Sequence, residues 1–94
     1  MTRDEVLAWL QTRKPAPPES LRARLVEAVH ARLPAPGSQL PSYLAQLGTN
    51  LLDGVVGKPD GGRELALDLL AADAFATYAF EAQAEQGKEA VDET

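Results

Sequence analysis

The sequence predicts an all-α protein, a small irregular bundle of four helices whose last helix is long and central. Two observations support this fold class: apolar residues recur at helical spacing in four segments, and runs rich in proline or glycine separate those segments. A chain of 94 residues is long enough for one domain and too short for two. The four helices are expected over about residues 3–13, 19–33, 41–55 and 63–86.

The first helix, residues 3–13, is predicted from a capping pattern and an apolar arc. Thr2 is followed three residues later by Glu5, the spacing at which each side chain can bond the other's backbone amide. Val6, Leu7 and Leu10 then lie on one side, with Trp9 at the margin. The prolines that follow at positions 15, 17 and 18 end the helix, because proline lacks the amide donor.

The second helix, residues 19–33, has the clearest amphipathic pattern in the chain. Its apolar residues fall on one side, with Glu19, Arg24 and Glu27 on the other; they are Leu21, Leu25, Val26, Ala28, Val29 and Leu33. The run Pro34-Ala35-Pro36-Gly37 ends this helix. Because both connectors are rich in proline, we expect them to hold the first three helices at fixed, nonparallel angles.

The third helix, residues 41–55, carries an apolar stripe and an internal glycine. The stripe consists of Leu44, Leu47, Leu51 and Val55. A glycine within a helix costs about 1 kcal/mol relative to alanine. Gly48 therefore indicates either close packing against another helix or a kink.

The fourth helix, residues 63–86, differs from the others because it is apolar on two faces. One face consists of Leu65, Leu69, Ala72, Ala76 and Ala79, with Phe80 near its edge. The second face consists of Leu67, Ala71, Ala74, Phe75 and Tyr78. Such a helix is either central in its own bundle or partly reserved for another chain. We expect residues 1–86 to form the single helical domain and residues 87–94 to form a flexible acidic tail.

Charge is unevenly distributed along the chain. The net charge is −5, with +2 on residues 1–47 and −7 on residues 48–94. This division can be satisfied by packing the first half on the second or by antiparallel association of two copies. Two aspartates interrupt the apolar fourth helix, and structural ion pairs with arginines of the second helix are expected. The candidates are Arg22, Arg24, Arg32, Asp68 and Asp73.

The composition speaks against catalysis, metal binding and a bound cofactor. The chain has no cysteine and one histidine, so it lacks a thiolate and cannot supply several nitrogen or sulfur ligands to a transition metal. His30 is the first candidate for acid–base work, but no hydroxyl or thiol nucleophile can be assigned to it, and we interpret it as a boundary residue of the second helix. We therefore predict a protein that is not an enzyme.

Nucleic acids and membranes are not expected as partners. No lysine or arginine lies between Pro34 and Gly57, so an element there could not neutralise phosphate groups. No stretch approaches the roughly 18 apolar residues of a membrane span, and the N-terminus lacks the pattern of a secretory signal. A cytoplasmic location is the resulting expectation.

The leading functional hypothesis is a non-catalytic interaction or assembly protein. In this hypothesis the second face of the fourth helix packs against another copy, giving a homo-oligomer such as a dimer, or against a different protein. The same face could equally be covered by the first and third helices within the monomer. A bundle that binds a small apolar ligand is the alternative, and a small enzyme subunit is the least favoured reading.

Overall fold

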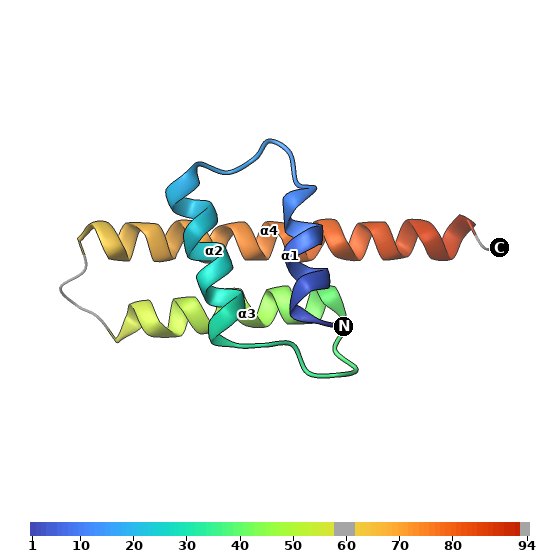
Figure 1. Cartoon of the computed structure of the whole chain (residues 1–94), viewed down its shortest axis with the longest axis horizontal. Coiled ribbons are helices and arrows are strands. Elements are labelled where there is room, and N and C mark those ends of the chain that lie inside the picture. The colour runs from blue at the N-terminus through green and yellow to red at the C-terminus, as the bar shows by residue number, and fades with distance from the viewer. Residues whose placement is uncertain (58–61, 93–94) are drawn as a thin grey trace.

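The computed structural model describes the backbone of residues 1–57 and 62–92, and the side chains of these residues apart from residues 63 and 88–92. Its helices are α1 (Arg3–Gln11), α2 (Glu19–Ala31), α3 (Leu40–Val56) and α4 (Arg63–Asp92). Helices α3 and α4 lie side by side as an antiparallel pair, and α1 and α2 cross over one face of that pair (Figure 1). The predicted all-α fold with four helices is confirmed over this part of the chain.

Helix α4 is longer than the sequence pattern predicted. It continues to Asp92, whereas we expected it to end at residue 86 and to give way to a flexible tail over 87–94. The added segment contains no proline, and its lysine, glutamate and alanine residues favour a helix. Figure 1 shows this end of α4 extending past α1. Residues 93–94 lie outside the described residues.

Local hydrogen bonds determine where the first two helices begin and end. The predicted capping box is confirmed, because the amide of Glu5 donates to the hydroxyl oxygen of Thr2 at 3.2 Å and the amide of Thr2 donates to the Glu5 carboxylate. Helix α1 was expected to end at residue 13 but ends at Gln11. The next residue, Thr12, caps it by donating its hydroxyl to the carbonyl of Trp9. Helix α2 ends at Ala31 rather than at residue 33, since the chain is already extended ahead of Pro34.

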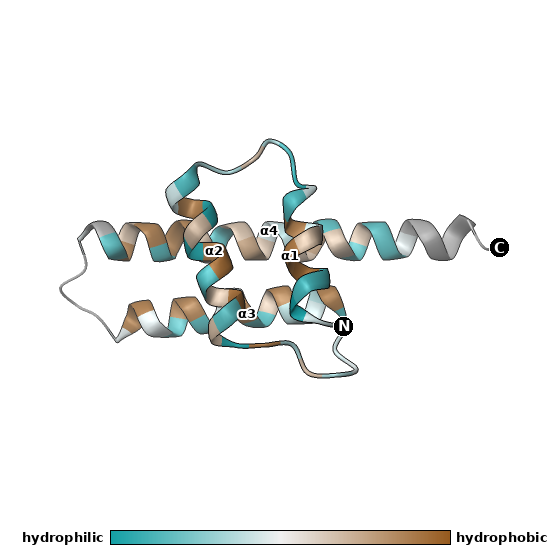
Figure 2. Cartoon of the chain, viewed as in Figure 1, coloured by the Kyte–Doolittle hydropathy of each residue, from teal (hydrophilic) through white to brown (hydrophobic). Residues whose placement is uncertain are grey.

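The core lies between the α3–α4 pair and the two helices that cross it. Its largest fully buried side chains come from all four helices and are Val6, Val29, Leu44 and Phe75. Apolar residues of α1 and α2 gather where these helices cross the pair (Figure 2). Burial of each large apolar side chain contributes about 1.5–3 kcal/mol to the free energy of unfolding. These four residues are therefore expected to contribute strongly to the stability of the fold.

Gly48 allows α3 and α4 to pack closely. A Cβ atom at this position would lie 3.2 Å from the backbone oxygen of Ala72 and 3.4 Å from the Cβ atom of Phe75. Of the two explanations that the sequence left open, the structure therefore supports close packing. Phe75, whose Cβ atom lies at this contact, is itself completely buried in the core.

Alanine substitutions at two glycines of α3 are expected to have opposite effects. Gly48→Ala should lower the free energy of unfolding by about 1 kcal/mol, because crowding of about 1–3 kcal/mol outweighs the gain in helix propensity. Gly54→Ala should raise it by about 0.5–1 kcal/mol, since no atom lies within 4 Å of its added Cβ. Urea denaturation of both variants measures the difference. Equal stabilisation by the two substitutions would show that the helices do not meet at Gly48.

Candidate functional site

The face of α4 that we expected to bind another chain lies inside the monomer. Ala71 and Phe75 are each 0% exposed, and the remaining members, Leu67, Ala74 and Tyr78, are partly buried. We call this set of five residues the inner face. The prediction that it serves as an intermolecular interface is therefore corrected, because packing within one chain already covers it. The reading in which other helices cover this face is the one the structure supports.

One of the predicted ion pairs connects α2 to the inner side of α4. The Nε atom of Arg24 donates to a carboxylate oxygen of Asp68 at 2.6 Å, and Asp68 is only 8% exposed. Arg24 also lies 3.8 Å from Glu27. The other candidates, Arg22, Arg32 and Asp73, are exposed and make no ion pair with any residue that the structure describes. The pair between Arg24 and Asp68 thus fixes α2 on α4.

A second polar cluster holds α1 against α4, and the sequence patterns did not reveal it. The guanidinium of Arg13 lies 3.8 Å from the centre of the Trp9 ring and contacts the carboxylates of Glu81 and Glu85 at 3.3 and 3.2 Å. The ring of Trp9 meets that of Tyr78 edge-on, with centroids 6.0 Å apart. Arg13 lies just beyond the end of α1, but in the helix predicted over residues 3–13 it follows Trp9 by four residues, and this spacing is the signal that could have indicated the stacking.

Burial changes the acidity of Tyr78 in this cluster. Removal of the phenol from water raises its pKa above the usual value, the nearby Glu81 carboxylate raises it further, and Arg13 acts in the opposite direction. The phenol is therefore uncharged at neutral pH, and it can donate a hydrogen bond.

The opposite face of the α3–α4 pair carries an apolar groove of about 420 Å³, which we call the outer groove. Its floor and walls include small residues of both helices, namely Ala45, Gly48, Ala72 and Ala76. No residue of α1 or α2 lines it, so it opens on the face that those helices leave uncovered. The ring of Phe80 stands at its edge and is 79% exposed.

Further exposed leucines extend this apolar surface. Leu52 of α3 lines the outer groove and is 47% exposed, and Leu69 of α4 is 44% exposed one turn before Ala72. Leu69, Ala72, Ala76 and Phe80 belong to the other apolar stripe of α4, which we did not predict to be the interface. The two faces recognised in the sequence are thus both present: the inner face is covered within the monomer, whereas the other stripe leaves Leu69, Ala76 and Phe80 exposed.

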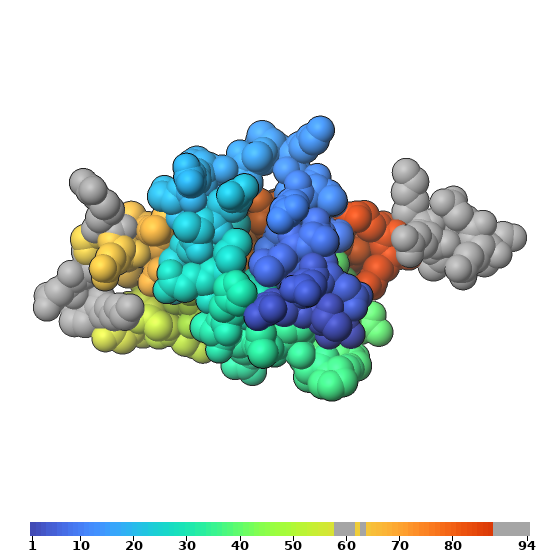
Figure 3. All heavy atoms as spheres, in the orientation of Figure 1, coloured from blue at the N-terminus to red at the C-terminus, as the bar shows by residue number. Residues whose placement is uncertain are grey.

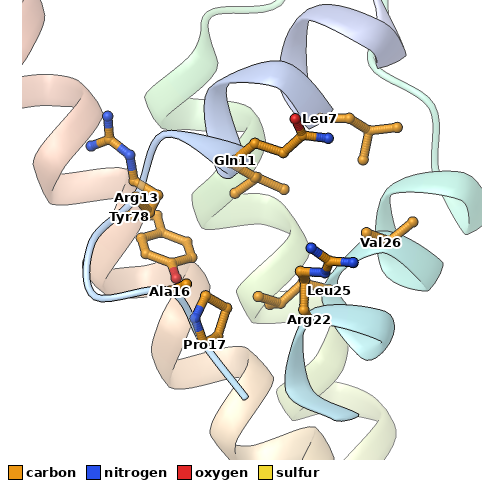
Figure 4. A pocket seen from close by; sticks show the side chains of 10 residues that line it. Leu7, Gln11, Arg13, Ala16, Pro17, Arg22, Leu25, Val26 and Tyr78 are labelled. Atoms are coloured by element: carbon orange, nitrogen blue, oxygen red, sulfur yellow. The ribbon is translucent and has the colours of Figure 1, made fainter. Parts of the chain in front are cut away.

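A second hollow, of about 440 Å³, lies on the side of the molecule formed by α1 and α2. We call it the crossing pocket, because it opens between the two crossing helices below the segment that connects them (Figures 3 and 4). Its walls come from α1, the connector, α2 and Tyr78 of α4. None of the residues that line this pocket was predicted from the sequence to bind a ligand.

The described part of the chain contains neither a cluster of metal-ligating side chains nor a helix that could span a membrane. No group of three or more histidine, aspartate or glutamate side chains gathers there in a way that could hold a metal ion. Among the helices described, none combines the length and the apolar character needed to cross a bilayer. His30 is exposed on α2 and makes no ion pair or side-chain hydrogen bond with the described residues.

Comparisons with known proteins identified no relative of this chain, so the candidate site is interpreted from its own geometry. No protein-family model matches this chain, and no curated protein or solved structure was found that is significantly similar to it.

Proposed function

We propose that this protein is a non-catalytic assembly module that forms a homodimer through the outer groove. The observation that carries the proposal is the combination, on one face, of a protruding aromatic ring at Phe80 and a groove between two helices floored by small residues. Aromatic side chains that insert into packed pockets supply much of the binding energy at protein interfaces.

The outer groove suits a second copy because a twofold interface must be complementary to itself. A twofold axis brings the same patch from both copies together, so each patch has to contain both a projection and a recess. Phe80, which is 79% exposed, provides the projection, and the small residues Ala45, Gly48 and Ala76 provide the recess. If the axis passes near Ala76 and at right angles to α4, Phe80 of each copy lies over Ala72 of the other, since both are four residues from Ala76.

The size of this face is comparable to that of a stable interface. At 1.5 Å per residue the 17 residues of α3 span about 25 Å, and two packed helices are about 20 Å wide, giving a projected face on the order of 500 Å². A standard interface takes about 800 Å² of accessible surface from each partner. The accessible surface of a side-chain-covered face exceeds its projection, so the α3–α4 face is large enough.

Charge also permits two copies to meet here. Each chain carries a net charge of −5, which disfavours close approach of two copies. None of the residues that line the outer groove is ionisable, so the interface core would not bring like charges into contact. Added salt screens the remaining repulsion, and it should therefore strengthen association.

Substitution of Phe80 tests the proposal. In Phe80→Glu, a carboxylate must enter an apolar interface without a partner, so we expect the dimer dissociation constant to rise at least tenfold. The control is Leu70→Glu, which places the same charge on an exposed residue of α4 that does not line the groove, and this variant should remain dimeric. Sedimentation equilibrium over a range of concentrations measures both constants. A wild-type chain that stays monomeric at 100 µM rejects the homodimer.

Single-cysteine variants test the position of the twofold axis. The chain contains no cysteine, so each added thiol can react only with the same residue of another copy. Ala76→Cys should form a crosslinked dimer under mild oxidation, whereas Thr77→Cys, which is the next residue of α4 and also exposed, should not. If both variants crosslink equally, the contact is nonspecific collision rather than the outer groove.

A further inference from the structure

The crossing pocket combines apolar walls with a positively charged group at its mouth. Leu7 of α1 faces Leu25 and Val26 of α2 across the hollow, and the ring of Tyr78 lies on its α4 side (Figure 4). Leu10 of α1 also lines it. A volume of about 440 Å³ falls within the range of about 300–1,000 Å³ that is typical of small-molecule sites. The walls can therefore accommodate a small apolar chain or ring.

The two arginines that line this pocket differ in how much of their charge is already neutralised. Arg13 contacts two carboxylates, those of Glu81 and Glu85, and its side chain is only 14% exposed. Arg22 makes no ion pair with any residue that the structure describes, and its guanidinium points into the space between α1 and α2 (Figure 4). The positive charge of Arg22 is thus available to a ligand.

Other polar groups at the pocket match an anionic head group. The carboxamide of Gln11 faces the same space from α1, and the phenol of Tyr78, which is protonated at neutral pH like that of any ordinary tyrosine, lies on the α4 side (Figure 4). Both can donate hydrogen bonds, as can a guanidinium, which pairs with a carboxylate through two parallel N–H groups. None of the lining residues is acidic.

We infer that the crossing pocket binds a small amphipathic carboxylate, with its hydrocarbon part between α1 and α2 and its carboxylate at Arg22. This site is on the side of the molecule formed by α1 and α2, whereas the outer groove lies on the face that those helices leave uncovered. The inference is therefore independent of the homodimer, and either can fail while the other holds. It assigns to the protein a ligand class, with Arg22 as the residue that recognises the charge.

Trp9 provides the measurement, because it is the single tryptophan of the chain and its ring contacts that of Tyr78, which lines the pocket. A ligand that moves Tyr78 should change the fluorescence of Trp9. The probes are octanoate, octan-1-ol and octylammonium, which share one hydrocarbon chain and carry a negative, a neutral and a positive head group. Each is titrated below the concentration at which it forms micelles, and calorimetry checks the stoichiometry of one per chain.

The expected order of affinity is octanoate, then octan-1-ol, then octylammonium. In Arg22→Gln, octanoate should bind about tenfold more weakly, the loss expected for one charge-assisted contact, while the affinity for octan-1-ol stays unchanged. Arg32→Gln is the matched control, because it removes the charge of another exposed arginine that does not line the pocket, and it should leave all three affinities unchanged.

Three outcomes overturn the inference. The first is the absence of saturable binding of octanoate to the wild-type protein. The second is equal affinity for octanoate and octan-1-ol, which would mean that the pocket does not recognise the carboxylate. The third is an equal loss of octanoate affinity in Arg22→Gln and Arg32→Gln, which would indicate a general effect of protein charge. Loss of octanoate selectivity in Arg22→Gln alone supports the site.

Discussion

Phe75→Ala is expected to lower the free energy of unfolding by about 3–5 kcal/mol, because it removes the largest fully buried side chain and leaves a cavity. A domain of 94 residues has a free energy of unfolding of about 5–14 kcal/mol, so this single substitution removes a large fraction of it. Thermal unfolding followed by circular dichroism should show a transition at least 10 °C lower, since about 1 kcal/mol corresponds to about 4–8 °C in a domain of this size.

Phe80→Ala is the matched control, because the same atoms are removed from the same helix five residues further on. The ring of Phe80 is 79% exposed, against 0% for Phe75, so its loss should change stability by less than about 0.5 kcal/mol. Both variants are measured at concentrations low enough to keep the protein monomeric, which separates folding from association. Similar losses of stability in the two variants would contradict the assignment of inner and outer faces of α4.

Arg24→Ala is expected to lower the free energy of unfolding by about 2–3 kcal/mol, because it leaves the buried carboxylate of Asp68 without its partner. Loss of one member of a fully buried pair costs about 3–5 kcal/mol. The side chains of Arg24 and Asp68 retain 22% and 12% of their exposure, so water compensates in part. Urea denaturation at neutral pH provides the measurement.

Three further variants show whether the effect comes from the ion pair. Arg22→Ala removes an exposed arginine of the same helix and should change stability by less than about 0.5 kcal/mol. Adding Asp68→Ala to Arg24→Ala should recover part of the lost stability, since the unpaired buried charge is removed as well. Asp68→Ala alone completes the cycle. If the loss of stability in the double variant equals the sum of the losses in Arg24→Ala and Asp68→Ala, the two side chains do not interact.

Much of the fold could be predicted from the sequence because the signals are local. Apolar spacing, the prolines of both connectors and the capping pair of Thr2 and Glu5 determined the number of helices and their approximate limits. The last turns were less predictable, because helix ends depend on single bonds such as the one from Thr12 to Trp9. The extension of α4 to Asp92 was missed for a similar reason, since a charged, alanine-containing segment is compatible with a helix or a tail.

The functional surfaces were harder to predict because they depend on which helix covers which face. The sequence showed two apolar stripes on α4, but periodicity alone does not say which one faces the core. The packing of Gly48 of α3 against Ala72 and Phe75 helps to fix the orientation, and this is a contact between residues distant in the chain. The ion pair between Arg24 and Asp68 was among the predicted candidates, whereas the pocket between α1 and α2 arises only from their crossing.

Helix α4 contributes to both the core and the outer groove, so only the thickness of one helix lies between them. Consecutive residues turn by about 100°, so Phe75, which is completely buried, is followed directly by Ala76, which is exposed. Residues that are adjacent in the sequence are therefore under different selective constraints. Phe75 must preserve the shape of the core, whereas Ala76 is free to vary unless another molecule binds over it. In related sequences, variability along this segment should rise and fall with the helical repeat, which would reveal whether the outer groove is used.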